Sequence, residues 1–185
     1  MKRSLLVCLI LCTVSFLCST NLMATPIPVT VGSEITFTDL DGIYNLSDNA
    51  KVPGRNAYGG AYTATSGEYS WITFCLEIDE ELAFNHEYIV GDISTEARYN
   101  GTDSATDAIS SFTAWLYTQA LNDPGSYNLA DVQYAIWLEE EELDEIPAQA
   151  FYYEEQEKYL AAVEKGEWSG LGNVRVINLG EDFRN

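Results

Sequence analysis

Apolar and polar residues alternate with a period of two through much of the chain between residues 29 and 100. This pattern is typical of β-strands that bury one face. Ile35 and Phe37 alternate with threonines, and similar runs cover residues 88–93 and 71–78. We therefore expect the first half of the chain to form β structure, with its clearest strand over residues 71–78.

Side chains on the predicted 71–78 strand divide between two faces, because successive residues of a strand point to opposite sides. Ile72, Phe74, Leu76 and Ile78 share one face, and Trp71, Thr73, Cys75 and Glu77 share the other. Cys75 thus points away from the purely apolar face, which argues against an inert core cysteine. The preceding segment, 53–70, is rich in glycine, tyrosine, serine and threonine and is predicted to be a long loop or a hairpin.

After Gly101 the apolar period changes to that of a helix. Ser104 and Asp107 are predicted to form an N-terminal capping pair, followed by an apolar stripe that ends before residues 122–125. Further elements are predicted as a helix from near Asn128 into the acidic patch 139–142, a helix over 148–165 and a strand over 174–177. The predicted fold is α+β: a β-sandwich or barrel-like unit with an inserted three-helix lobe and a C-terminal strand.

The N-terminus has the pattern of a secretory signal peptide. Lys2 and Arg3 precede an apolar run that is shorter than the roughly 20 residues of a membrane span. We assign residues 1–24 to this leader and residues 25–185 to a single domain, and expect a secreted or cell-surface protein without stable membrane insertion. The leader contains Cys8, Cys12 and Cys18.

Cys75 is therefore the one cysteine of the predicted mature chain. Thiols of exported proteins usually pair as disulfides, so a lone cysteine requires a reason. A small buried hydrophobe, an intermolecular disulfide and a reactive thiol are the alternatives.

The chain is strongly acidic, with 29 Asp and Glu residues against nine Lys and Arg, and a formal net charge of −20. Such a surface repels nucleic acid and anionic membranes. Solubility outside the cell explains the charge better than calcium binding, because no segment has the spaced ligands of a calcium loop. The nearest match, 38–42, is also a good turn sequence. We expect no cofactor.

Gln133 lies in the middle of an apolar face of the second predicted helix, together with Leu129, Val132, Ile136 and Trp137. A buried carboxamide without partners costs about 1–3 kcal/mol. Gln133 therefore needs either a hydrogen-bond partner or a chemical change. A thioester with Cys75 would provide the latter, since it expels the amide nitrogen as ammonia.

A thiolate attacks an amide only in near-attack geometry, which two rigid elements meeting face to face can provide. The bond must then be kept from water, and Trp71 and Trp137 are candidates for a lid, although aromatic residues at such positions are more often core. The predicted pocket around Cys75 and Gln133 is formed by Trp71, Thr73, Glu77, Ile136 and Trp137.

The two motifs, Phe74-Cys75 and the run Val132-Gln133-Tyr134-Ala135-Ile136-Trp137, resemble those of the thioester domains at the tips of bacterial surface adhesins. In that family an aromatic or aliphatic residue precedes the cysteine, and a hydrophobic-Gln-x-x-hydrophobic-Trp run supplies the acyl partner. The longer context, 67–77, is similar to exported bacterial proteins of this family that often carry a C-terminal Pro-Glu-Pro sorting tail. The resemblance covers about residues 30–180.

By this resemblance, Cys75 supplies the sulfur and Gln133 the acyl group of an internal thioester. The implied partner is a surface protein or polysaccharide with amine or hydroxyl groups, and the implied role is covalent adhesion rather than enzymatic turnover. The sequence departs from the adhesins in having no repeat stalk, no wall-sorting motif and no Pro-Glu-Pro tail. The mode of surface attachment is therefore left open.

Other functions compete with this one. A cysteine hydrolase needs a base near Cys75, and His86 is the only histidine; one Cys and one His are too few ligands for zinc. Glu77 could tune the thiol. A non-covalent carbohydrate- or protein-binding module, with tyrosines as its contact surface and the cross-link silent or absent, is the main alternative.

Overall fold

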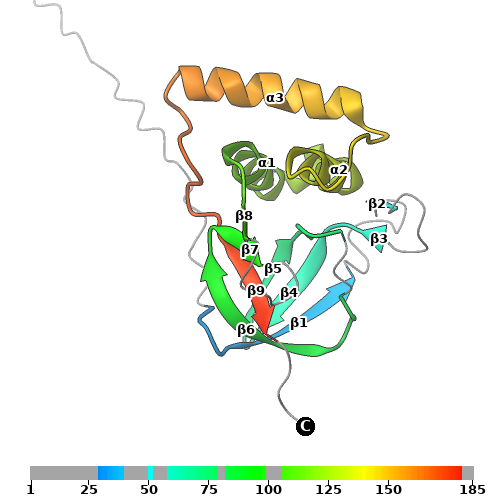
Figure 1. Cartoon of the computed structure of the whole chain (residues 1–185), viewed down its shortest axis with the longest axis vertical. Helices are drawn as coiled ribbons and strands as arrows, with labels where there is room; N and C mark the ends of the chain where they lie inside the picture. Colours follow the sequence, from blue (N-terminus) through cyan, green and yellow to red (C-terminus); the bar gives the residue numbers. More distant parts are fainter. Residues whose placement is uncertain (1–28, 40–49, 52–57, 79–81, 99–105, 181–185) are drawn as a thin grey trace, which may run out of the picture.

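The structure is a computed structural model of the whole chain, and it describes residues 29–39, 50–51, 58–78, 82–98 and 106–180. The predicted leader, 1–24, lies outside the described residues. The predicted α+β class is confirmed: a curved antiparallel sheet lies below a helical lobe (Figure 1).

The main sheet has five antiparallel strands in the order β5-β4-β1-β6-β9. They are β1 Glu34–Asp39, β4 Tyr62–Ser66, β5 Tyr69–Thr73, β6 Glu87–Ser94 and β9 Val176–Gly180. The predicted alternation holds in β1, where Ile35 and Phe37 are buried. β4 and β5 form a two-residue hairpin in which Gly67 takes a φ of 59°, a value that glycine adopts without strain. Of the two predictions for 53–70, the hairpin is the one that forms over 62–70, whereas 53–57 lie outside the described residues.

Two short ribbons flank the sheet. β2 Ala50–Lys51 pairs with β3 Tyr58–Gly59, and β7 Glu96–Arg98 pairs with β8 Thr106–Ala108. β8 corrects the predicted start of the first helix. Thr106–Ala108 is a strand because it pairs with β7, so Asp107 does not lie in a helical cap; Ser104 is outside the described residues.

Three helices are inserted between β8 and β9: α1 Ser111–Asn122, α2 Leu129–Glu139 and α3 Gln149–Glu164, with a 3-10 turn at Pro124–Ser126. Ser110 is the N-cap of α1, and its hydroxyl oxygen accepts the Thr113 N–H. Asn128 caps α2 in the same way. The second and third predicted helices are thus confirmed within a few residues.

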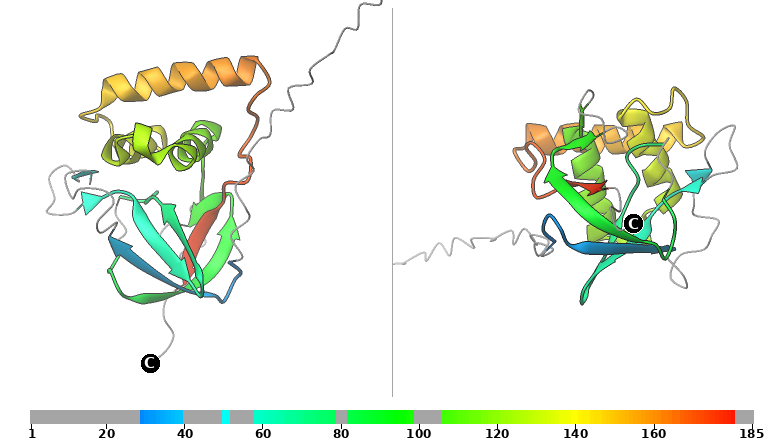
Figure 2. Two further views of the ribbon diagram at one scale, coloured as in Figure 1. Left: turned by 180° about the vertical axis from the view of Figure 1, so that it is seen from behind. Right: turned by 60° about the horizontal axis from the view of Figure 1, so that its bottom comes forward.

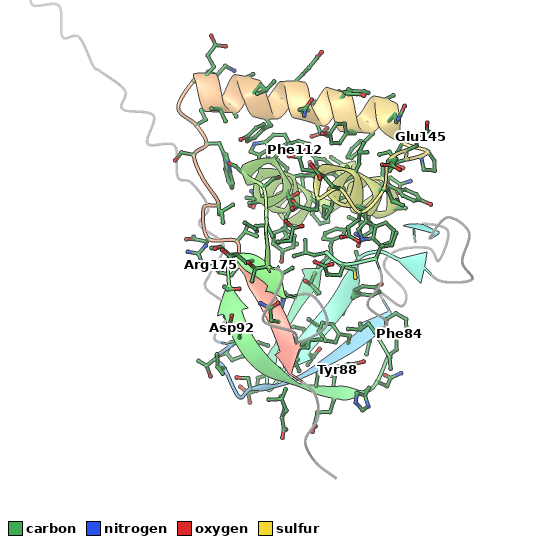
Figure 3. All side chains as sticks on the ribbon, in the orientation of Figure 1. Phe84, Tyr88, Asp92, Phe112, Glu145 and Arg175 are labelled. Atoms are coloured by element: carbon green, nitrogen blue, oxygen red, sulfur yellow. The ribbon has the colours of Figure 1, made fainter. Side chains whose placement is uncertain are left out.

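α1 and α2 lie over one end of the sheet, and α3 crosses above both helices (Figures 1 and 2). Aromatic side chains fill the contact between α3 and α1. Phe112, labelled in Figure 3, meets the rings of Tyr152 and Tyr159 at centroid distances of 5.5 Å. The helical lobe therefore has its own packed core above the sheet.

Two apolar clusters meet at β5. One lies among the three helices, reaches β5 at Ile72, and contains Phe112, Leu116, Val132 and Ile136. The other lies inside the curved sheet and contains Ile35, Phe37, Tyr62 and Val90. β5 therefore separates the core of the sheet from the core of the helical lobe.

Candidate functional site

Cys75 lies just beyond the end of β5. The strand predicted over 71–78 ends at Thr73, and 74–78 is irregular backbone, so the second half of that prediction is wrong. The physical reason lies in β4, whose pairing with β5 begins at Tyr62, opposite Thr73. Residues beyond Thr73 have no strand opposite them.

The alternation of side chains nevertheless continues past the end of the strand. Ile72, Phe74 and Leu76 pack against the helical cluster, while Cys75 packs against the cluster inside the sheet. Ile78 departs from the predicted pattern: it joins the side chains that pack with Cys75 against Ala130 and Trp137. Cys75 is only partly buried.

Gln133, in the second turn of α2, is completely buried, and its carboxamide contacts the backbone of Cys75. Its Nε2 donates to the Cys75 carbonyl oxygen at 2.7 Å, and its Oε1 accepts the Cys75 N–H at 3.0 Å. Continuing the β4–β5 register would place Gly60 opposite Cys75. The carboxamide thus provides the pair of hydrogen bonds that a strand neighbour would make. We call these two bonds the Gln133 clasp.

The Gln133 clasp joins two elements that are 58 residues apart in the sequence. It also satisfies the buried carboxamide, so an ordinary structural role explains the burial of Gln133. At the same time, it holds the amide carbon, which carries both Oε1 and Nε2, beside the residue that bears the thiol. The predicted meeting of Cys75 and Gln133 is therefore present in the fold.

The thiol of Cys75 bonds back to its own chain. Sγ donates to the carbonyl oxygen of Glu77 at 3.0 Å, and Cys75 is not part of a disulfide. Glu77 itself is buried, with 9% of its surface exposed, unlike most glutamates. Its contact with Cys75 is made by the backbone carbonyl, so the predicted pocket role of the Glu77 side chain stays a prediction.

The remaining predicted pocket residues divide between the two cores. Trp137 is buried beside Ala130, in the cluster that Cys75 contacts, and Trp71 packs with Cys75 on the sheet side. Ile136 packs in the helical cluster instead, and Thr73 ends the ladder with β4. Trp137 is also pressed against Gly59, where an added Cβ would lie 2.1 Å from ring atom Cη2. The two tryptophans thus belong to the two different clusters against which Cys75 packs.

Two further side chains, which sequence reasoning missed, fasten the segment around Cys75 to the helices. Glu142 Oε2 accepts the Ile78 N–H at 3.0 Å, and the Tyr117 hydroxyl donates to the Ile72 carbonyl oxygen at 2.8 Å. Burial raises the pKa of Tyr117 to about 12, so this hydroxyl keeps its proton. Nothing in the sequence marks either residue, because each partner is a backbone group of a distant segment.

The acidic end of α2 also holds other elements in place. Glu140 Oε1 accepts the Ser110 N–H at 3.1 Å, and Glu139 accepts the Tyr152 hydroxyl at 2.7 Å. Burial raises the pKa of Glu140. These two carboxylates therefore join α2 to α1 and α3 by hydrogen bonds, in addition to contributing negative charge.

The alternative sites receive little support. His86 is exposed and packs edge-on against Tyr88, and none of the hydrogen bonds found among the described residues joins it to Cys75. Within those residues, no group of three His, Cys, Asp or Glu side chains could hold a metal ion, and no helix is long and apolar enough to cross a membrane. Residues 40–42 of the nearest calcium-loop match lie outside the described part.

No protein-family model, curated protein or solved structure matches this chain. The resemblance to thioester domains therefore depends on the two sequence motifs, and it stays a prediction.

Proposed function

We propose that Cys75 and Gln133 form an internal thioester, through which this protein acylates amine or hydroxyl groups of a target surface. The observation that carries the proposal is the Gln133 clasp. It holds the buried amide of Gln133, which is carried by α2, against Cys75, the thiol-bearing residue that follows β5. Such positioning can replace a large part of the barrier to attack.

Formation of the bond is a balanced exchange. The Cys75 sulfur attacks the side-chain amide carbon of Gln133, the carbonyl electrons move to Oε1, and the intermediate collapses with loss of Nε2. The thiol proton leaves with that nitrogen, which departs as ammonia. The Cys75 N–H, at 3.0 Å from Oε1, is placed to stabilise the oxyanion.

Reaction with a target reverses the exchange with a new nucleophile. A target amine or hydroxyl attacks the thioester carbon, and the Cys75 thiolate leaves and takes up the proton. The product is an amide or ester between Gln133 and the target. Cys75 is partly exposed whereas Gln133 is completely buried, so a nucleophile would have to approach the bond from the Cys75 side.

Intact mass of the secreted protein tests the proposal. We expect a mass one ammonia below that of the mature sequence, gain of one methylamine on treatment, and little reaction with thiol reagents beforehand. Cys75→Ala and Gln133→Glu should each abolish the methylamine adduct, while Gln156→Glu, on α3, should leave it unchanged. A full-mass protein whose thiol titrates in the folded state would refute the bond.

The same measurements separate two related functions. A silent structural cross-link would show the ammonia loss but would resist methylamine until the protein is unfolded. A non-covalent binding module would bind its target equally well after Cys75→Ala.

A further inference from the structure

Trp137 carries a buried donor for which the described residues provide no acceptor. Its Nε1 is inaccessible to solvent and makes no hydrogen bond in the part of the chain that the structure describes, and the whole residue is 1% exposed. Buried polar groups are nearly always paired, so an exception requires an explanation. By contrast, the Nε1 of Trp168 has both Ser111 Oγ and the Gly170 carbonyl oxygen within 3.2 Å.

The unpaired donor lies next to the candidate site. Trp137 follows Gln133 by one helical turn, and helical side chains lean toward the N-terminus, so the indole extends over the turn that carries Gln133. Cys75 packs against the cluster that Trp137 forms with Ala130. Contact with Gly59 fixes the far edge of the ring, because no side chain separates the two.

We propose that the Trp137 Nε1–H is the second donor of an oxyanion hole, whose first donor is the backbone N–H of Cys75. This inference rests on the proposed thioester. In the resting carboxamide, Oε1 of Gln133 accepts the Cys75 N–H and the indole donor is idle. A donor that is used only when negative charge develops on Oε1 stabilises the transition state more than the ground state, which is the condition for catalysis.

Both chemical steps pass through the same oxyanion. When the Cys75 sulfur attacks, and again when a target amine attacks, the carbonyl electron pair moves to Oε1 and returns as the leaving group departs. Ammonia leaves in the first step, and the Cys75 thiolate leaves in the second and takes the proton of the amine. The Trp137 donor exchanges no proton or electron in either step. Because the same oxyanion forms in both steps, the donor is expected to raise the rates of both.

Replacement of Trp137 by 3-benzothienylalanine tests this role, since sulfur takes the place of the N–H in a ring of nearly the same shape. We expect opening by methylamine, followed by intact mass, to slow at least tenfold. A folded variant that no longer loses ammonia would also support the role. An unchanged rate of opening with complete ammonia loss would overturn it.

Trp168 provides the matched control. The same replacement there removes an N–H that bonds Ser111 and Gly170 rather than the candidate site, so the rates of thioester formation and opening should stay unchanged. Equal slowing at both positions would overturn the proposal. Trp137→Phe offers a second route if the analogue does not fold, with the same expected slowing and the same refuting result. Should the wild-type protein keep its full mass, the thioester itself fails, whereas failure of the Trp137 role leaves the wild-type bond intact.

Discussion

The Gln133 side chain combines a structural and a proposed chemical role at one position. Its carboxamide is buried and bonds both backbone groups of Cys75. The Gln133 clasp involves only the backbone of Cys75, so it survives removal of the thiol. The two roles can therefore be separated by mutation.

Gln133→Ala in a Cys75→Ala background should lower the free energy of unfolding by about 2–4 kcal/mol, because it opens a cavity and leaves the Cys75 N–H and carbonyl without partners. Cys75→Ala alone should cost about 4 kcal/mol if the cross-link forms, from the loss of a 58-residue closed loop. Urea titration of the single and double variants measures both effects. A negligible loss from Gln133→Ala in the thiol-free background would contradict the structural role.

Gly59 is the other residue whose identity the site requires. A Cβ there would overlap the Trp137 ring, since no rearrangement short of moving the indole provides room. We expect Gly59→Ala to destabilise the fold by about 1–3 kcal/mol through overpacking. Gly125→Ala is the control, because nothing lies within 4 Å of its Cβ position. Equal thermal midpoints for the two variants would show that the contact is not tight.

At the scale of elements, α2 organises the site. Gln133 and Glu142 hold the segment after β5 at Cys75 and Ile78, and Glu140 holds the start of α1. The position of α2 depends on its N-cap, Asn128, whose Oδ1 accepts the Ala130 and Asp131 N–H groups.

Asn128→Ala should therefore cost about 1 kcal/mol, whereas Asn128→Asp, which keeps a capping oxygen, should cost much less. Chemical denaturation of both variants measures the difference. Equal losses would mean that the side-chain cap does not stabilise α2.

Glu140 gives α2 a pH-dependent contribution to stability. Burial raises its pKa, and nearby Asp107 and Glu139 add to this increase, so the folded protein binds a proton more readily than the unfolded chain. The ionised group therefore reduces stability above its folded pKa, and this loss disappears as the pH falls to the ordinary carboxyl range.

Glu140→Gln, which keeps an acceptor for the Ser110 N–H, should accordingly raise the free energy of unfolding near neutral pH. The gain should shrink as the pH falls toward the ordinary glutamate pKa of 4.5. Exposed Glu145→Gln is the charge-matched control, because it changes the net charge equally without replacing a buried carboxyl group. Parallel unfolding curves at several pH values would detect the shrinking gain, and a gain independent of pH would contradict the burial argument.

At the scale of the whole molecule, the net charge of −20 opposes compaction. Ion pairs within the described residues include those of Lys158 with Glu154 and Glu155, both on its own helix. Local pairing of this kind does little to offset repulsion among the other carboxylates.

Added salt should therefore stabilise the fold by screening. We expect the thermal midpoint to rise by a few degrees between about 10 mM and about 150 mM ionic strength, over which the Debye length shortens from about 30 Å to about 8 Å. NaCl and KCl should act alike. A midpoint that falls with salt would show that attractive pairs outweigh repulsion.

The sequence by itself determined the local elements with strong periods. The strands around Ile35 and residues 88–93, and the helices that begin after Asn128 and near Ala148, follow from the spacing of apolar residues and from caps. It also singled out Cys75 and Gln133, because a lone thiol and a carboxamide on an apolar face each need an explanation. These are properties of a residue and its near neighbours in the chain.

Only the tertiary structure decided where β5 ends, that Thr106–Ala108 pairs as a strand, and which groups Gln133 contacts. Each outcome depends on a partner in another element: β4 begins at Tyr62, β7 lies beside Thr106–Ala108, and α2 lies over Cys75. For the same reason, the roles of Glu142 and Tyr117 and the unpaired Trp137 donor could not be read from the sequence. A side-chain hydrogen bond to another element, or its absence, has no local signature, because it is set by the packing of separate elements.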